Sequence, residues 1–218
     1  MTSGAVGGAP SPQPPPARGG GGHSSSRRRV GILISGRGSN MAALIAAARE
    51  PGYPAEIVLV ISNRPDAAGL ALAREAGVPA LAVDHRPFKG DREAHEAAID
   101  AALREARVDI VCLAGYMRLL TPRLIDAWAG RMLNIHPSLL PAFPGLHTHE
   151  RALAEGAKLH GCTVHLVTQT MDEGPILAQA AVPVLPDDTP DTLAARVLEQ
   201  EHLIYPRALR DFVAVKQS

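Results

Sequence analysis

The chain has 218 residues, of which 46% are hydrophobic, and its 22 Lys and Arg balance its 22 Asp and Glu. This length and apolar content suffice for one compact domain, or for one domain with a tail, and exclude several large domains within the chain. The formal net charge of zero excludes a chain-wide attraction to nucleic acid or to anionic lipid, so neither is expected as a partner.

The cysteines and the apolar runs indicate where the protein works. Cys112 and Cys162 lie in apolar stretches without a Cys-x-x-Cys spacing, which is typical of buried thiols in a reducing compartment. No apolar run has the length of a membrane span, and the first residues lack the apolar segment of a secretory signal. We therefore expect a cytoplasmic protein with no membrane partner.

The N-terminal residues differ in composition from the rest of the chain. Residues 1–26 are almost entirely Gly, Pro, Ala and Ser, and such a segment cannot bury enough apolar surface to offset the entropy of ordering it. The arginine run at 27–29 is predicted to be a solvated collar at the domain edge; a phosphate-binding patch is the alternative. The predicted division is a disordered low-complexity tail at residues 1–28 and a single domain at residues 29–218.

From Val30 onward, short apolar runs alternate with helical patterns. Strands are predicted at residues 30–34, 57–61, 80–83 and 110–114, and helices at residues 41–49, 67–76 and 91–107. The last of these helices is expected to face the core with Ala94, Ala98, Ala101, Ala102 and Leu103. Because the strands are apolar on both faces, the pattern predicts an α/β fold that is doubly wound, with a mostly parallel sheet and helices on both faces.

The second half of the chain departs from this simple alternation. A fifth strand is predicted at residues 132–135, and a proline-rich loop then leads to a short helix at 150–157. Strands at 163–167 and 176–184 are expected to form a hairpin-like pair joined by a tight turn around residues 172–174. A helix at 193–209 closes the predicted domain.

A glycine-containing loop, SGRGSN at residues 35–40, connects the first predicted strand to the first helix. Glycines let the backbone turn sharply and approach a ligand, and the following helix directs its positive N-terminal end to the same place. The loop lacks the spacing and the lysine of a P-loop, and Met41 occupies the third glycine position of a dinucleotide fingerprint. It therefore predicts a site for one phosphate, with a turn chosen only for its geometry as the alternative.

Asn134 and His136 lie two residues apart at the end of the fifth predicted strand, so alternation places both side chains on the same side of the sheet. The carboxyl ends of parallel strands form the ligand crevice of open α/β sheets, and the loop at 35–40 must lie there too. A nearby Asp172 carboxylate would favour the charged form of His136, which could then stabilise an oxyanion or donate a proton. The spacing does not by itself identify the reaction.

Histidines gather in the same region, which raises the question of a metal site: His147, His149, His160 and His165. Their spacings match no familiar zinc pattern, and neither a His-Glu-x-x-His motif nor paired cysteines accompany them. No metal is expected.

Four motifs occur in a characteristic order: ISGRGSN at residues 34–40, AGYMRLL at 114–120, NIHPSLLP at 134–141 and PGLHTH at 144–149. Together they resemble the phosphoribosylglycinamide formyltransferase family, folate-dependent enzymes of purine synthesis. The resemblance runs from residue 29 to the C-terminus and implies the formyltransferase fold, whose N-terminal half is Rossmann-like. It implies transfer of a formyl group from the co-substrate 10-formyltetrahydrofolate to glycinamide ribonucleotide (GAR) by a monomer or homodimer whose partners are these small molecules.

The resemblance also implies which residues form the site. The matching catalytic residues are Asn134, His136 and Asp172. The residues that match the GAR-binding positions are Gly38, Ser39, Asn40, Leu198, Glu199, Gln200 and Glu201, with Glu201 the foremost of the helical group. The residues that match the folate-binding positions are Arg92, Met117, Arg118, Leu119, Leu120, Asn134, Thr168, Gln169, Thr170, Met171 and Asp172.

Two residues depart from the family pattern. Arg37 stands where a smaller polar residue is often found, and it could strengthen phosphate binding or face solvent. Glu173 stands where glycine is common, which puts the local turn geometry in question.

In the implied reaction, the GAR amine attacks the formyl carbon, Asn134 and protonated His136 stabilise the oxyanion, and Asp172 assists proton transfer. Three other functions stay open. A formyltetrahydrofolate hydrolase would use a similar triad on water, but the phosphate loop argues against it. A methionyl-tRNA formyltransferase would need an RNA-binding domain or a basic face, which the sequence lacks. A nucleotide-binding module without chemistry would require all three residues to be structural.

Overall fold

The computed structural model describes Met1 and residues 27–215. The tail predicted at residues 1–28 lies outside the described residues except for Met1, Arg27 and Arg28, and Arg28 is the first residue of strand β1 (Arg28–Ile34). The expectation of a solvated arginine collar is confirmed only in part, since Arg27 is exposed and the Arg29 side chain is 41% exposed, but both also bind neighbouring segments. Arg27 Nε donates to Ala55 O at 3.0 Å, and Arg29 Nη1 pairs with Glu56 Oε1 at 2.9 Å. The run therefore supplies donors to neighbouring chain segments at the amino end of the sheet.

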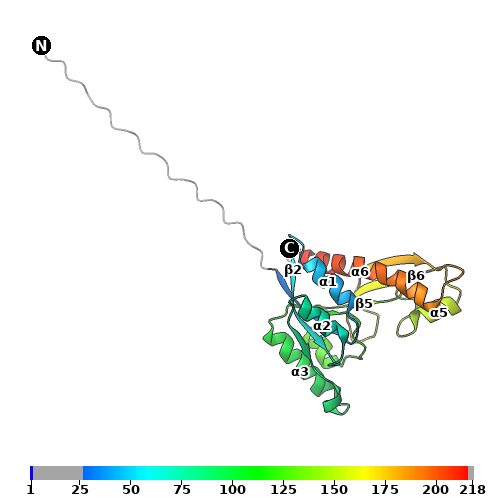
Figure 1. Ribbon diagram of the computed structural model, residues 1–218, viewed down its shortest axis with the longest axis horizontal. Helices are drawn as coiled ribbons and strands as arrows, with labels where there is room; N and C mark the ends of the chain where they lie inside the picture. The colour runs from blue at the N-terminus through cyan, green and yellow to red at the C-terminus, as the bar shows by residue number, and fades with distance from the viewer. Residues whose placement is uncertain (2–26, 216–218) are drawn as a thin grey trace.

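Strands and helices alternate through the first two thirds of the described chain (Figure 1). The strands after β1 are β2 (Ala55–Ser62), β3 (Ala80–Ala82), β4 (Ile110–Leu113), β5 (Met132–His136), β6 (Leu159–Leu166) and β7 (Ile176–Pro183). The α-helices are α1 (Ser39–Ala48), α2 (Ala68–Glu75), α3 (Arg92–Glu105), α4 (Pro122–Ala127), α5 (Thr148–Ala154) and α6 (Pro190–Val215), and a short 3-10 helix spans Arg86–Phe88. Helix α4 is absent from the predicted elements because its six residues are too few to show a helical period.

The strands form one sheet in the order β3-β2-β1-β4-β5-β6-β7. Strand β1 pairs in parallel with both β2 and β4, and β4 pairs in parallel with β5. Strands β6 and β7 join in antiparallel fashion. The strand order reverses between β1 and β4, so the loops that follow β1, β4 and β5 meet at one edge of the sheet, where open α/β sheets bind their ligands. The predicted doubly wound, mostly parallel fold is confirmed.

Apolar cores lie on both faces of the sheet. On one face, Val30, Ile32 and Ile34 of β1 belong to a buried cluster with residues of α1, α2 and α6. On the other face, Leu33 belongs to a cluster with residues of α3 and α4. Figure 1 shows α1 and α6 together on one side of the sheet and α3 on the other. This alternation along β1 is the reason that the strand reads as a continuous apolar run.

Tyr205 holds α6 against the edge of the sheet where the loops after β1, β4 and β5 meet. Its hydroxyl lies 3.0 Å from Leu113 O of β4 and 3.2 Å from Leu133 O of β5. Glu201 lies one helical turn earlier and therefore on the same side of α6. The buried tyrosine thus sets the position of that carboxylate.

The predicted inner face of α3 is confirmed for Leu103 and in part for Ala102, which packs against the same core cluster, but it is wrong for Ala94 and Ala101. Ala94 and Ala101 are exposed, and the buried positions are His95, Glu96, Ile99 and Leu103. His95 Nε2 donates to Val83 O at 2.8 Å, and Glu96 accepts from Thr121 N at 2.9 Å. Because these polar side chains have hydrogen-bond partners, they can be buried where small alanines would leave space unfilled.

The antiparallel pairing of β6 with β7 confirms the predicted hairpin, but its connection runs through residues 167–175 and is not a tight turn. Gly174 lies against the end of β6 within this connection. A Cβ atom added to Gly174 would lie 1.7 Å from Leu166 O, which is backbone and cannot move aside as a side chain could.

We therefore expect Gly174→Ala to lower the free energy of unfolding by about 2 to 4 kcal/mol, because the two chain segments must separate. Urea unfolding of the variant and of wild type measures the difference. Gly36→Ala is the control, since its added Cβ meets no atom within 4 Å, and it should stay within about 0.5 kcal/mol of wild type. Equal midpoints for Gly174→Ala and wild type would contradict the close approach.

Candidate active site

Strand β5 brings Asn134 and His136 to the edge where the parallel strands end. In the register with β6, Asn134 lies opposite His165 and His136 lies opposite Thr163. His136 is buried, with 6% of its surface exposed. The two side chains point to the same face of the sheet because they are two residues apart on one strand.

His136 has an acceptor beside each ring nitrogen. Its Nε2 donates to Phe143 O at 3.0 Å, and its Nδ1 lies 3.6 Å from Asp172 Oδ2. The Asp172 side chain is itself buried, and its Oδ2 accepts from Gly145 N at 2.8 Å. Since a carbonyl and a carboxylate both accept, each nitrogen of a charged His136 would have a partner for its proton.

His165 completes this cluster, and the sequence weighed it only as a metal ligand. Its Nδ1 donates to Leu166 O at 2.9 Å, so its Nε2 is free to accept from Asn134 Nδ2 at 3.2 Å. The same Nε2 lies 3.8 Å from Asp172 Oδ1. Burial lowers the pKa of His165, which favours the neutral ring that this arrangement needs. Asn134 is thereby held in place with its second amide hydrogen available to a ligand.

The backbone around the cluster is held in a conformation that non-glycine residues seldom adopt. Phe143, His147 and Asp172 have φ angles of 53°, 57° and 58°. Each such backbone conformation costs about 1–3 kcal/mol and persists only where the surrounding structure enforces it. Residues in these conformations are found most often at functional sites. Arg151 supports the loop, since its guanidinium lies 5.5 Å from the Phe143 ring centre and donates to Pro144 O at 2.6 Å.

A second histidine pair lies behind Phe143. His160 Nε2 is 3.2 Å from His149 Nδ1, and the His160 ring meets the Phe143 ring edge-on at 5.7 Å between centres. Burial lowers the pKa of both histidines, to about 4 for His160, and the charge of His149 lowers the pKa of His160 further. Among the described residues, no group of three or more His, Cys, Asp or Glu side chains is placed to hold a metal ion.

The lowered pKa of His160 predicts a loss of stability in mild acid. The unfolded chain takes up a proton near pH 6.5 and the folded chain only near pH 4, so stability present above pH 6.5 is lost as the pH falls through this window. Between pH 7.5 and pH 5.0 this histidine should cost about 2 kcal/mol. Urea unfolding should show a smaller acid-induced loss for His160→Gln than for wild type; equal losses would rule this origin out.

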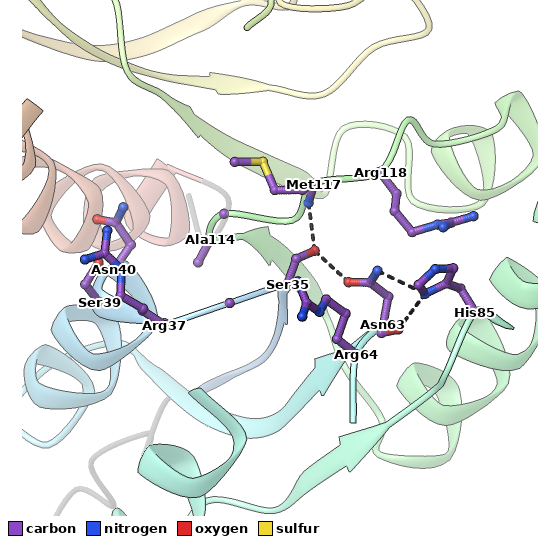
Figure 2. Close-up of a pocket in the computed structure, with 13 residues that line it drawn as sticks. Ser35, Arg37, Ser39, Asn40, Asn63, Arg64, His85, Ala114, Met117 and Arg118 are labelled. Carbon is purple, nitrogen blue, oxygen red and sulfur yellow. Dashed lines mark hydrogen bonds between the residues drawn. The ribbon is translucent and has the colours of Figure 1, made fainter. Parts of the chain in front are cut away.

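The predicted phosphate loop lines a cavity of about 550 Å³ at the same edge of the sheet. Gly38 has a φ of 77° and precedes the first turn of α1, whose leading amides have no helical partner. Ser39 and Asn40 also line the cavity (Figure 2). Arg37 lines it too, so this departure from the family pattern lies beside the loop's ligand space.

Asn40 connects this loop to α6. Its Nδ2 donates to Glu201 Oε2 at 2.6 Å, while its buried Oδ1 has no hydrogen-bond partner within the described chain. Burial raises the pKa of Glu201, and the bond from Asn40 partly offsets this. The pair offers acceptor oxygens to a ligand that carries an amine or hydroxyl group.

The other predicted ligand-binding residues are less clearly directed at the cavity or at the cluster around Asn134 and His136. Leu198 and Gln200 are half-buried, but Glu199 is exposed, because consecutive residues of a helix point in different directions. Gln169 Nε2 donates to Asp126 Oδ1 of α4 at 2.9 Å, and Thr168 Oγ1 donates to Thr170 O at 3.0 Å. Arg92 begins α3, is exposed and does not line the cavity.

Exposed apolar side chains surround the edge of the sheet. Met117, Leu119 and Met171 are 74%, 62% and 55% exposed, and Leu120 is half-buried beside the core under α3. Arg118 lines the cavity next to Met117. Glu173, the second departure from the family pattern, is exposed. The residue before it, Asp172, is the one with the left-handed backbone conformation.

No helix in the described part of the chain combines the length and the apolar character needed to cross a membrane. Both cysteines are buried free thiols, as predicted.

Comparison with known proteins places this site in a family. The family model described as formyl transferase matches residues 28–209. Phosphoribosylglycinamide formyltransferase of Haemophilus influenzae is 42% identical over 184 residues, which are 84% of this chain and 86% of that protein. A crystal structure of phosphoribosylglycinamide formyltransferase from Brucella melitensis has a TM-score of 0.83 and 62% identity, covering 87% of this chain and 97% of its own.

Longer proteins contain a similar segment. The trifunctional purine biosynthetic protein adenosine-3 of Drosophila melanogaster is 51% identical over 183 residues, which are 83% of this chain but only 14% of that protein. The match to the family model and the similarity along nearly the whole length of the bacterial proteins agree with the fold and with the motifs. The chain belongs to the formyl transferase family.

Proposed function

We propose that the chain transfers the formyl group of 10-formyltetrahydrofolate to the amine of GAR, which gives N-formylglycinamide ribonucleotide and tetrahydrofolate in purine biosynthesis. The observation that carries this proposal is the shared edge of the sheet. There, the cluster of Asn134, His136 and Asp172 lies on the same edge as a loop suited to one phosphate. Relatives that align along most of their length bear the name of this activity.

The phosphate loop and α6 would hold the nucleotide. The free amides at the start of α1 suit a phosphate, since they add to the positive end of the helix. Asn40 Oδ1 and Glu201 then accept from the hydroxyl or amine groups of the same molecule. Of the helical residues that match the family's binding positions, Glu201 is the one whose contacts support this role.

The folate would lie at the same strand ends, on the side away from the phosphate loop and α6. Met117, Leu119 and Met171 present exposed apolar surface that a flat heterocycle could cover. Residues 168–172 form the neighbouring loop. At its end, Asp172 lies 3.8 Å from His165 Nε2, which in turn is 3.2 Å from Asn134 Nδ2. Arg92 would act only on a distant part of the folate, since it does not line the cavity.

The reaction follows from these positions. The GAR amine attacks the formyl carbon, and negative charge develops on the formyl oxygen. The free amide hydrogen of Asn134 donates to that oxygen, the positive charge of His136 stabilises it electrostatically, and Asp172 stabilises the imidazolium. The amine loses one proton and the folate nitrogen gains one as the intermediate collapses, so no covalent enzyme intermediate forms. Holding both substrates in one site contributes about 7–11 kcal/mol to lowering the barrier.

A steady-state assay of the purified chain with 10-formyltetrahydrofolate, with and without GAR, tests this function. Tetrahydrofolate should form only when GAR is present. Equal turnover without GAR would indicate a formyltetrahydrofolate hydrolase, and binding without turnover would indicate a module that lacks chemistry. A cytoplasmic location and a monomeric or dimeric state stay predictions from the sequence.

A further inference from the structure

The loop between β4 and α4 carries four of the residues that match folate-binding positions. It spans residues 114–121 and contains Met117, Arg118, Leu119 and Leu120. Met117 and Leu119 are mostly exposed, and the structure shows no hydrogen bond between Leu119 or Leu120 and another described residue. The middle of this loop therefore takes its position from its two ends.

The start of the loop is bound to the end of β1. Ser35 N donates to Gly115 O at 3.1 Å, and Met117 N donates to Ser35 Oγ at 2.8 Å, a bond drawn in Figure 2. All three residues line the ligand cavity. This end of the loop thus belongs to the site already described.

The other end of the loop is held by Glu96, a buried carboxylate of α3. Thr121 N donates to Glu96 Oε1 at 2.9 Å, and Thr121 Oγ1 donates to Glu96 Oε2. The two residues are 3% and 8% exposed, and neither lines the cavity. Their contact therefore acts on the loop from behind.

The surroundings of Glu96 are partly apolar, since Ile99 and Leu103 of the same helix are fully buried. Burial raises the pKa of Tyr116, and the charge of Arg118 lowers it while that of Glu96 raises it, so both charges lie near this ring. An apolar side chain can often replace a buried carboxylate without loss of stability, because it has no charge to desolvate. Only an acceptor, however, can hold the amide and the hydroxyl of Thr121. What the carboxylate adds is a fixed end for the loop.

Glu96 also relates the loop to Arg92. The two residues are four apart on α3, so their side chains lie on the same side of the helix, one turn from each other. Arg92 begins α3 and matches a folate-binding position. The bonds from Thr121 therefore set where the loop lies relative to the helix start that carries Arg92.

We infer that Glu96 is a positioning residue for the folate, which holds residues 117–120 in place relative to Arg92 without lining the cavity itself. This inference rests on the proposed function. Without the contact to Thr121, folate binding would have to supply the free energy of ordering the loop, which raises the KM for the folate. The value of kcat should change little, because the catalytic cluster lies on β5 and in the connection after β6.

Steady-state kinetics of Glu96→Met, with each substrate varied in turn, tests the inference. Methionine is a long apolar side chain and a poor acceptor. The KM for 10-formyltetrahydrofolate should rise about tenfold, whereas kcat and the KM for GAR should stay within about twofold of wild type. Glu105→Met makes the same change at an exposed position of α3 and should match wild type in all three constants.

Variants of Thr121 test the same contact from the other side. Thr121→Val loses only the hydroxyl bond and should raise the KM for the folate by a smaller factor, while Thr121→Ser keeps both bonds and should match wild type. Adding Thr121→Val to Glu96→Met should change the KM no further, because both residues act through one contact.

A folded Glu96→Met variant with an unchanged KM for the folate would overturn the inference. So would a rise in both KM values together with a loss of kcat, which would show a general structural role. If urea unfolding shows that Glu96→Met does not fold, the two Thr121 variants decide the question, and equal KM values for the folate in both would overturn it.

Equilibrium dialysis with tetrahydrofolate separates this inference from the proposed function. If wild type binds tetrahydrofolate but does not formylate GAR, the proposed function fails, and about tenfold weaker binding by Glu96→Met would still support the positioning role. If wild type formylates GAR and Glu96→Met binds tetrahydrofolate as tightly as wild type, the inference fails and the proposed function stands.

Discussion

His136→Ala is expected to lower kcat for GAR formylation by about a thousandfold or more while the protein stays folded. The ring can carry a positive charge on the same face of β5 as Asn134, and it contacts both Phe143 O and Asp172. Losing a proton donor and an oxyanion stabiliser costs on the order of a hundred- to ten-thousandfold in rate. Steady-state kinetics with both substrates, together with the urea midpoint of the variant, measure the effect.

His147→Asn is the matched control for this change. His147 lies on the adjoining loop with its side chain 75% exposed, and asparagine tolerates its left-handed backbone conformation. Its kcat should stay within about twofold of wild type. A His136→Ala variant that retained more than a tenth of wild-type kcat would show that the buried ring is structural.

Asp172→Asn is expected to lower kcat by about a hundred- to ten-thousandfold. The substitution keeps an oxygen that can accept from Gly145 N, and asparagine also accommodates the φ angle of 58°, so the loop should keep its shape. What the variant lacks is the negative charge beside His136 and His165. The loss should therefore appear in kcat.

Glu173→Gln removes the next carboxylate along the chain, which is exposed, and serves as the control for charge. It should leave kcat as in wild type. If Asp172→Asn changed KM for the folate but not kcat, the carboxylate would be a binding group and the proposed proton chemistry would be wrong.

Local sequence patterns were sufficient for the fold and for part of the site. The apolar runs of β1, β2 and β4 are long enough, and the intervening helical patterns clear enough, to specify a doubly wound sheet. The two-residue spacing of Asn134 and His136 predicts their common face, because strand alternation is a local property. The position of Gly38 before α1 follows from its loop in the same way.

Features that depend on tertiary contacts could not be predicted in this way. His165 meets Asn134 only through the register of β5 with β6, which no local pattern specifies. The hydrogen bonds that bury His95 and Glu96 join α3 to distant segments, so a search for apolar residues missed that face. The position of Asp172 depends on a long connection in which Asp172 itself adopts a left-handed conformation, and the expected tight turn did not include either feature.

The most direct test of the account follows the formyl group itself. Wild type and Asp172→Asn would be mixed in a single turnover with GAR and 10-formyltetrahydrofolate labelled with ¹⁴C in the formyl carbon, and the products separated. The account predicts that wild type places the label in N-formylglycinamide ribonucleotide and that the variant does so at least about a hundredfold more slowly. Label released as formate, or an equal rate in the variant, would contradict it.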